Sequence, residues 1–141
     1  MPLLDWDEKY SVGDPMMDTQ HKKWIGYINE LYDAVKEKRG EAEQAEILEN
    51  VVIYTRYHFA SEERLLKRID YPSLDEHHQI HERMTQKAIA MQKEVNAGQA
   101  DRCLELIELL RTWLVDHILT EDKKYSEFVV VKSKREAVLV G

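Results

Sequence analysis

The sequence predicts an all-α fold: an antiparallel up-down-up-down four-helix bundle with an extended N-terminal arm and a short C-terminal segment. The 141 residues include only 5 Gly and 3 Pro, too few for the frequent turns of a β-sandwich or barrel. Apolar residues recur at helical spacing along four long segments. The turns between these segments are short, so neighbouring helices must run antiparallel.

Each element follows from a local signal. Residues 1–17 lack helical periodicity and contain two prolines, so we expect an extended arm there. Asp18 is then expected to be the N-cap of the first helix. The tail, 123–141, mixes apolar and basic residues and predicts a short docking helix or strand. We expect the whole chain, 1–141, to form a single domain, with helices at about 18–39, 41–69, 73–96 and 100–119.

Composition narrows the classes of function. The 20 Lys and Arg residues against 27 Asp and Glu residues give a net charge of −7, which leaves no broad basic face for nucleic acid or anionic membrane. The first residues lack the features of a signal peptide, and no stretch approaches the roughly 20 apolar residues of a membrane span. The single Cys103 excludes an internal disulfide and fits a reducing compartment. We therefore expect a cytoplasmic protein without nucleic-acid or membrane partners.

Metal-ligand side chains gather on the inner faces of the predicted helices. Burying several imidazoles and a carboxylate without partners would cost several kcal/mol per group. Measured from the turns near residues 40, 71 and 98, and at about 1.5 Å per residue, these side chains lie at nearly one level of the bundle. All four helices therefore contribute to one predicted cluster, which consists of His21, His58, Glu62, His77, His81 and His117.

A fourth-helix carboxylate is harder to assign from spacing. Asp122 lies five residues after His117, which on a regular helix points it away from the cluster. Periodicity alone favours Glu121, and Asp122 can reach inward only if the helix ends or loosens after His117. On the second helix, regular geometry favours Glu62 over Glu63.

The ligand set indicates a metal. Five imidazoles with one or two carboxylates exceed what one tetrahedral zinc ion uses. Magnesium and calcium prefer all-oxygen shells. Two six-coordinate ions that share carboxylate bridges would use the whole set, and iron is the expected occupant.

This pattern resembles the hemerythrin family, in its single-domain bacterial form. The resemblance covers about residues 5–125 and favours Asp122 over Glu121. It implies two iron ions (Fe²⁺/Fe³⁺) bridged by Glu62, Asp122 and an oxo or hydroxo group, and no organic cofactor. It also implies that the first iron is held by three imidazoles and that the second keeps one open position for dioxygen. The implied ligands are His77, His81 and His117 for the first iron, and His21 and His58 for the second.

The resemblance implies reversible dioxygen binding, for carriage, storage or delivery, and not an enzyme. In the family a leucine at the position of Leu114 lines the dioxygen pocket. Further pocket residues are expected, although core packing alone also explains each of them: Trp113, Ile25, Phe59 and Ile118.

Two alternatives remain open. One is a di-iron peroxidase or an enzyme that handles nitric oxide, although no further acid or base lies on the inner faces near the open position. The other is a sensor of dioxygen or iron that acts through a partner. A protein that receives the dioxygen is also left open as a partner.

Overall fold

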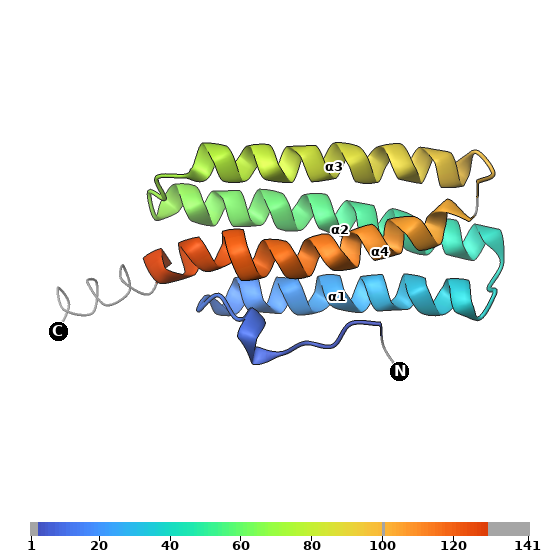
Figure 1. Cartoon of the computed structure of the whole chain (residues 1–141), viewed down its shortest axis with the longest axis horizontal. Helices are drawn as coiled ribbons and strands as arrows, with labels where there is room; N and C mark the ends of the chain where they lie inside the picture. Colours follow the sequence, from blue (N-terminus) through green and yellow to red (C-terminus); the bar gives the residue numbers. More distant parts are fainter. Residues whose placement is uncertain (1–2, 100, 130–141) are drawn as a thin grey trace.

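A computed structural model describes residues 3–99 and 101–129, and it confirms the predicted fold class. Consecutive helices run in opposite directions, and α1 also contacts α4, which closes a four-helix bundle (Figure 1). No strand is present within the described ranges. The helices are α1 (Pro15–Lys36), α2 (Glu41–Arg68), α3 (Leu74–Asn96) and α4 (Arg102–His117).

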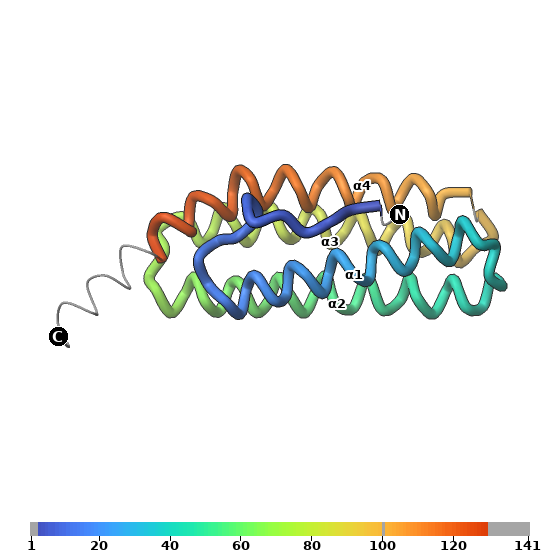
Figure 2. The backbone as a smooth tube through the Cα atoms, turned by 90° about the horizontal axis from the view of Figure 1, so that it is seen from below, coloured from blue at the N-terminus to red at the C-terminus, as the bar shows by residue number. Residues whose placement is uncertain are grey.

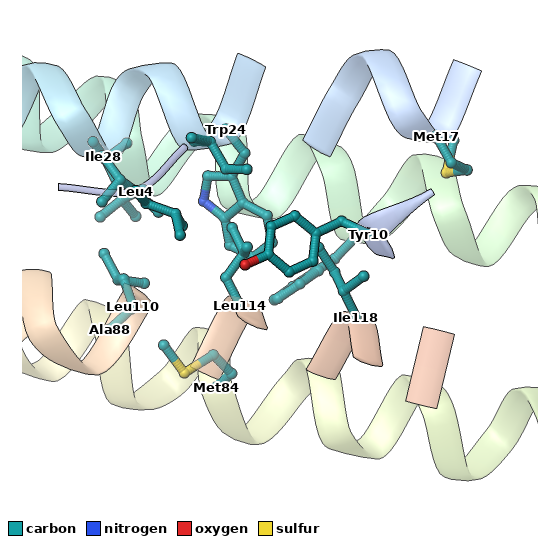
Figure 3. Close-up of a cluster of buried hydrophobic side chains, with 14 of the residues drawn as sticks. Leu4, Tyr10, Met17, Trp24, Ile28, Met84, Ala88, Leu110, Leu114 and Ile118 are labelled. Carbon is teal, nitrogen blue, oxygen red and sulfur yellow. The ribbon is translucent and has the colours of Figure 1, made fainter. Parts of the chain in front are cut away.

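The core is a continuous set of apolar side chains from all four helices. Full burial of one such side chain stabilises a fold by about 1.5–3 kcal/mol. Figure 3 shows part of this cluster, where side chains from α1, α3, α4 and the N-terminal arm meet. Its fully buried members include Trp24, Ile28, Leu31, Leu106, Leu110 and Leu114.

The start of α1 differs from the prediction. Asp14 is the N-cap, and its side chain accepts a hydrogen bond of 3.1 Å from the Met17 amide. Pro15 follows at the first helical position, where a missing N–H costs nothing. Asp18, predicted as the cap, instead accepts hydrogen bonds from the Val12 amide and the Ser11 hydroxyl. The expected arm is therefore shorter than predicted.

The other helix ends differ by a few residues. α1 ends at Lys36 because Lys38 adopts a left-handed conformation with φ 55°. Asp70, with φ 57°, marks the turn between α2 and α3, so α3 begins at Leu74. Gly98, with φ 104°, follows α3 at a conformation that glycine adopts easily.

The N-terminal arm, which includes the short 3-10 helix η1 (Glu8–Tyr10), lies along the seam between α1 and α4 (Figure 2). The Leu4 amide donates to the Asn29 side chain at 3.0 Å, and the Asn29 amide group returns a bond to the Leu4 carbonyl at 2.8 Å. Near the other end of the arm, the Lys123 ammonium donates to the Ser11 carbonyl. These bonds hold the arm over the bundle.

The chain continues beyond α4 as the π-helix η2 (Ile118–Asp122) and then as α-helix over 123–129. Tyr125 and Val129 are buried there. This part of the predicted tail is therefore helical, while residues 130–141 lie outside the described residues. No helix in the described part of the chain is both long and apolar enough to cross a bilayer.

Candidate metal centre

The seven predicted ligand residues come together at one end of the bundle. The early part of α1, the second half of α2, the start of α3 and the end of α4 with η2 contribute them. All seven are buried, each with 5% or less of its surface exposed. They are His21, His58, Glu62, His77, His81, His117 and Asp122.

Their side chains form two overlapping groups. One contains His77, His81 and His117 together with both carboxylates, and we call its imidazoles the three-histidine group. The other contains His21, His58 and Glu62, and we call its imidazoles the two-histidine group. Within each group the candidate ligand atoms lie within 4.8 Å of one another, close enough to share one ion.

Glu62 joins the two groups. Its Oε1 lies 2.7 Å from His77 Nε2 and 3.1 Å from His81 Nε2. Its Oε2 faces the other way, 3.6 Å from His21 Nε2 and 3.4 Å from His58 Nε2. One carboxylate therefore presents one oxygen to each group, the arrangement needed to bridge two ions.

Asp122 repeats this arrangement from the opposite side. Its Oδ1 lies 3.2 Å from His77 Nε2 and 3.0 Å from His117 Nε2. Its Oδ2 lies 3.4 Å from His21 Nε2. Each of the two carboxylates thus contacts both the three-histidine group and the two-histidine group.

The π-helix η2 explains how Asp122 reaches the cluster. The Lys123 amide donates to the Ile118 carbonyl, a bond across five residues that widens the helix at this point. This wider turn brings Asp122 inward, where it is fully buried, despite its spacing of five residues from His117. Glu121 instead contacts the exposed Lys124 ammonium at 3.2 Å. The expectation from regular helix geometry, which favoured Glu121, is therefore wrong.

The imidazoles and carboxylates shift each other's pKa values. Burial lowers the pKa of His21, but contacts with Asp122 and Glu62 outweigh it and raise the pKa to about 9. The same balance raises the pKa of His77 to about 10. For His58, burial and the nearby His21 lower the pKa. Without metal the cluster thus holds protons, which a metal must displace in order to bind.

The carboxylates show the opposite balance. Burial raises the pKa of Glu62, but close contacts with surrounding imidazoles, His21 foremost, hold it well below its usual range. Burial and the Glu62 charge also raise the pKa of Asp122. The contacts with His117 and His21 outweigh this and leave the pKa of Asp122 below its usual range. Both side chains are therefore ionised at neutral pH and carry the charge that a cation requires.

Several of these buried atoms lack an ordinary hydrogen bond. Both oxygens of Asp122 and both ring nitrogens of His21 have none in the described part of the chain, although imidazole nitrogens lie close to them. Leaving such groups buried without partners costs about 1–3 kcal/mol each. Lone pairs that converge without hydrogen bonds are typical of a metal site, and this donor set suits non-haem iron.

Three residues that contact the cluster from outside were not predicted in that role from the sequence: Gln20, Tyr125 and Glu63. The His58 Nδ1–H donates to the Gln20 carbonyl oxygen at 2.8 Å, and the Gln20 amide group donates to Ser61 at 2.9 Å. The Tyr125 hydroxyl donates to Glu62 Oε2 at 2.9 Å. Gln20 could have been found from its place on the inner face of α1, next to His21. Tyr125 could not, because its direction depends on the π-helix before it.

A third outer contact joins Glu63, on α2, to the ring of His81. Glu63 Oε2 lies 3.0 Å from His81 Nδ1. Glu62 is fully buried in the cluster, whereas Glu63 is only half-buried and lies outside it. This agrees with the prediction from regular helix geometry.

The predicted pocket residues are three aliphatic side chains and two aromatic rings. Leu114, Ile25 and Ile118 are buried, and Figure 3 shows Leu114 and Ile118 beside Trp24 and Tyr10. The remaining two lie flat against imidazoles of the three-histidine group. Phe59 stacks on His81 with ring centroids 3.9 Å apart, and Trp113 stacks on His117 at 4.2 Å.

Comparison with known proteins agrees with this geometry. The family described as the hemerythrin HHE cation binding domain matches residues 12–129. A bacteriohemerythrin of Pseudomonas aeruginosa (strain PAO1) is 35% identical, over 96% of this chain and 92% of the relative. A bacteriohemerythrin of Stenotrophomonas maltophilia (strain R551-3) is 33% identical, over 92% of this chain and 83% of the relative.

Solved structures show the same likeness in three dimensions. The crystal structure of wild-type hemerythrin superposes with a TM-score of 0.82 at 27% identity, covering 89% of this chain and 96% of that one. An L114A mutant of hemerythrin gives a TM-score of 0.84 at 26% identity, covering 91% of this chain and 98% of that one. With the family match spanning most of its length, this chain belongs to the hemerythrin family.

Proposed function

We propose that the chain binds dioxygen reversibly at a non-haem di-iron centre, for carriage, storage or delivery of dioxygen, and that it is not an enzyme. The observation that carries the proposal is that each of two carboxylates lies between the three-histidine group and the two-histidine group. Glu62 and Asp122 each present one oxygen to either group. Such a set suits two ions held side by side and exceeds what one ion needs.

The two groups supply unequal numbers of ligands. In this proposal one iron is held by His77, His81 and His117, and the other by His21 and His58. Both carboxylates would be held in common by the two ions, with an oxo or hydroxo group as a further ligand. The two-histidine group contributes one imidazole fewer, which would leave a position for dioxygen on that side. When bound, the ferrous pair supplies the two electrons that dioxygen takes up reversibly.

The surrounding residues keep the ligands in place and water out. The Tyr125 hydroxyl holds Glu62 Oε2, and Gln20 holds His58 through Nδ1. Trp24, with 1% of its surface exposed, lies against His58 with ring centroids 5.4 Å apart. A dry surrounding slows the loss of reduced oxygen species, which protects reversibility.

The decisive experiment is an anaerobic optical titration of the ferrous protein with dioxygen, with iron counted per chain. We expect about two irons per chain and a visible band that appears with dioxygen and disappears on deoxygenation. Immediate conversion to a stable oxidised spectrum without that band would contradict reversible binding.

One observation favours an enzyme as a second candidate. The sequence predicts no further acid near the open position, yet the Tyr125 hydroxyl donates to Glu62 Oε2, the oxygen that faces the two-histidine group. Burial and the nearby carboxylates raise the pKa of Tyr125 well above its usual range, so the hydroxyl keeps its proton. Turnover of peroxide or nitric oxide well beyond that of free iron, lost in Tyr125→Phe, would support this candidate.

A further inference from the structure

Glu63 lies just outside the candidate metal centre and contacts two imidazoles of α3. Its Oε2 lies 3.0 Å from His81 Nδ1, and its Oε1 contacts His78 Nδ1. The Glu63 side chain is 22% exposed, the His81 side chain 2% and the His78 side chain 55%. The carboxylate therefore lies between a buried candidate ligand and a histidine at the surface.

The two nitrogens of the His81 ring face opposite ways. Nε2 points into the cluster, 3.1 Å from Glu62 Oε1 and 3.1 Å from His117 Nε2. Nδ1 points out to Glu63. Because an ionised carboxylate can only accept hydrogen bonds, Nδ1 must carry the proton in this contact. In the neutral imidazole, the Nε2 lone pair then faces the cluster, where a cation can bind it.

Two further contacts hold this arrangement in place. Phe59 stacks on the His81 ring with 7° between the ring planes, which fixes the tilt of the imidazole. The His78 ring occupies the second oxygen of Glu63, which prevents the carboxylate from turning away. The orientation of the His81 ring is thus fixed by Phe59 on its face and by Glu63 at Nδ1.

The corresponding contact on the two-histidine group is of a different kind. His58 Nδ1 donates to the amide oxygen of Gln20 at 2.8 Å, and this partner carries no charge. His21 Nδ1 has no hydrogen-bond partner among the described residues. The structure therefore places a negative outer partner on the three-histidine group and neutral or no partners on the two imidazoles opposite.

We infer that Glu63 is a positioning residue whose charge sets the metal affinity and the reduction potential of the three-histidine side. The inference rests on the proposed function, since it assigns a role within that centre. A carboxylate on the outer nitrogen makes an imidazole a stronger electron donor to its metal. Stronger donation favours the ferric over the ferrous ion, so the Glu63 charge lowers the reduction potential on this side.

The test compares Glu63→Gln with Glu82→Gln. Glu63→Gln keeps an oxygen that accepts from His81 and removes only the charge. Glu82 is an exposed carboxylate one residue after His81 and serves as the matched control. Two quantities are measured: the affinity of the metal-free protein for Co²⁺, by chelator competition, and the reduction potential of the iron-loaded protein.

We expect Glu63→Gln to weaken Co²⁺ binding about tenfold and to raise the reduction potential, while Glu82→Gln changes neither. Wild-type values of both quantities in Glu63→Gln would overturn the inference, because a side chain that only packs would give that result. If wild-type protein binds dioxygen reversibly and Glu63→Gln changes nothing, this inference fails and the proposed function stands. If dioxygen binding fails but Co²⁺ affinity falls in Glu63→Gln, the inference stands without the proposed function.

Discussion

The two imidazole groups of the candidate metal centre lie in different surroundings. Hollows adjoin the three-histidine group, although its imidazoles are buried: one of about 230 Å³ is lined by His81 and Glu63, and another of about 330 Å³ by His117 and the half-buried Trp113. In the two-histidine group, His21 has 0% and His58 1% of its surface exposed.

The two groups thus differ in the number of imidazoles and in what lies beside them. The group with more imidazoles lies beside these hollows. The group with fewer ligands lies in the apolar interior beside Trp24, where water has little access. If dioxygen binds at the second group, as proposed, the fold itself protects the open position.

The largest expected effect comes from Glu62→Ala, because Glu62 alone belongs to both ligand groups. We expect iron affinity to fall by more than about 100-fold, beyond the 10–100-fold typical of outer contacts, and both groups to lose metal together. Iron per chain after chelator challenge measures this, with the exposed Glu82→Ala as control. Retention of one iron per chain in Glu62→Ala would break the proposed link between the groups.

The second prediction concerns how the stability of the metal-free protein depends on pH. His21 and His77 have pKa values raised to about 9 and about 10, against an ordinary value of 6.5. Their folded-state protons stabilise the metal-free protein fully below pH 6.5, and this stability is lost as pH rises through 9 and 10.

We therefore expect the free energy of unfolding of metal-free protein to fall by on the order of 6 kcal/mol between pH 7 and pH 10. Urea unfolding measures the loss, and His77→Gln should reduce it. Imidazole NMR should find His58 neutral at pH 7, because burial and the His21 charge lower its pKa. An equal pH dependence in His77→Gln would contradict the assignment.

The third effect concerns the π-helix. Asp122→Ala should weaken iron binding about 100-fold, at the upper end of the range for groups around a metal, because Asp122 faces imidazoles of both groups. Glu121→Ala, which removes only a surface ion pair, should leave binding unchanged. Iron content and the rate of autoxidation measure the difference, and greater damage from Glu121→Ala would show that the bridge is wrongly assigned.

The smallest effect tests the hydroxyl on Glu62 Oε2. Tyr125→Phe removes a hydrogen bond to a buried charge and should lower the free energy of unfolding by about 1.5 kcal/mol. Because that oxygen faces the two-histidine group, we also expect faster autoxidation with unchanged iron content. Tyr71→Phe, at a half-buried ring next to Tyr125, is the matched control. Equal autoxidation rates in both variants would show that the hydroxyl has no part in protecting that side.

The sequence by itself determined the helical class, the level at which the histidines meet and the residue types of the cluster. These follow from spacing, because a helix of known rise places His21, His58, His77 and His117 at comparable heights once the turns are recognised. The i,i+4 relation also favours Glu62 over Glu63 without any knowledge of packing.

Only the tertiary structure decided which fourth-helix carboxylate enters the cluster and what lies behind each imidazole. Asp122 faces inward because η2 is widened, and regular periodicity cannot predict where a helix departs from its own period. The contacts of Gln20 with His58, Glu63 with His81 and Tyr125 with Glu62 join residues 15 or more positions apart. Such contacts depend on how helices are rotated against one another, which packing sets and local sequence does not.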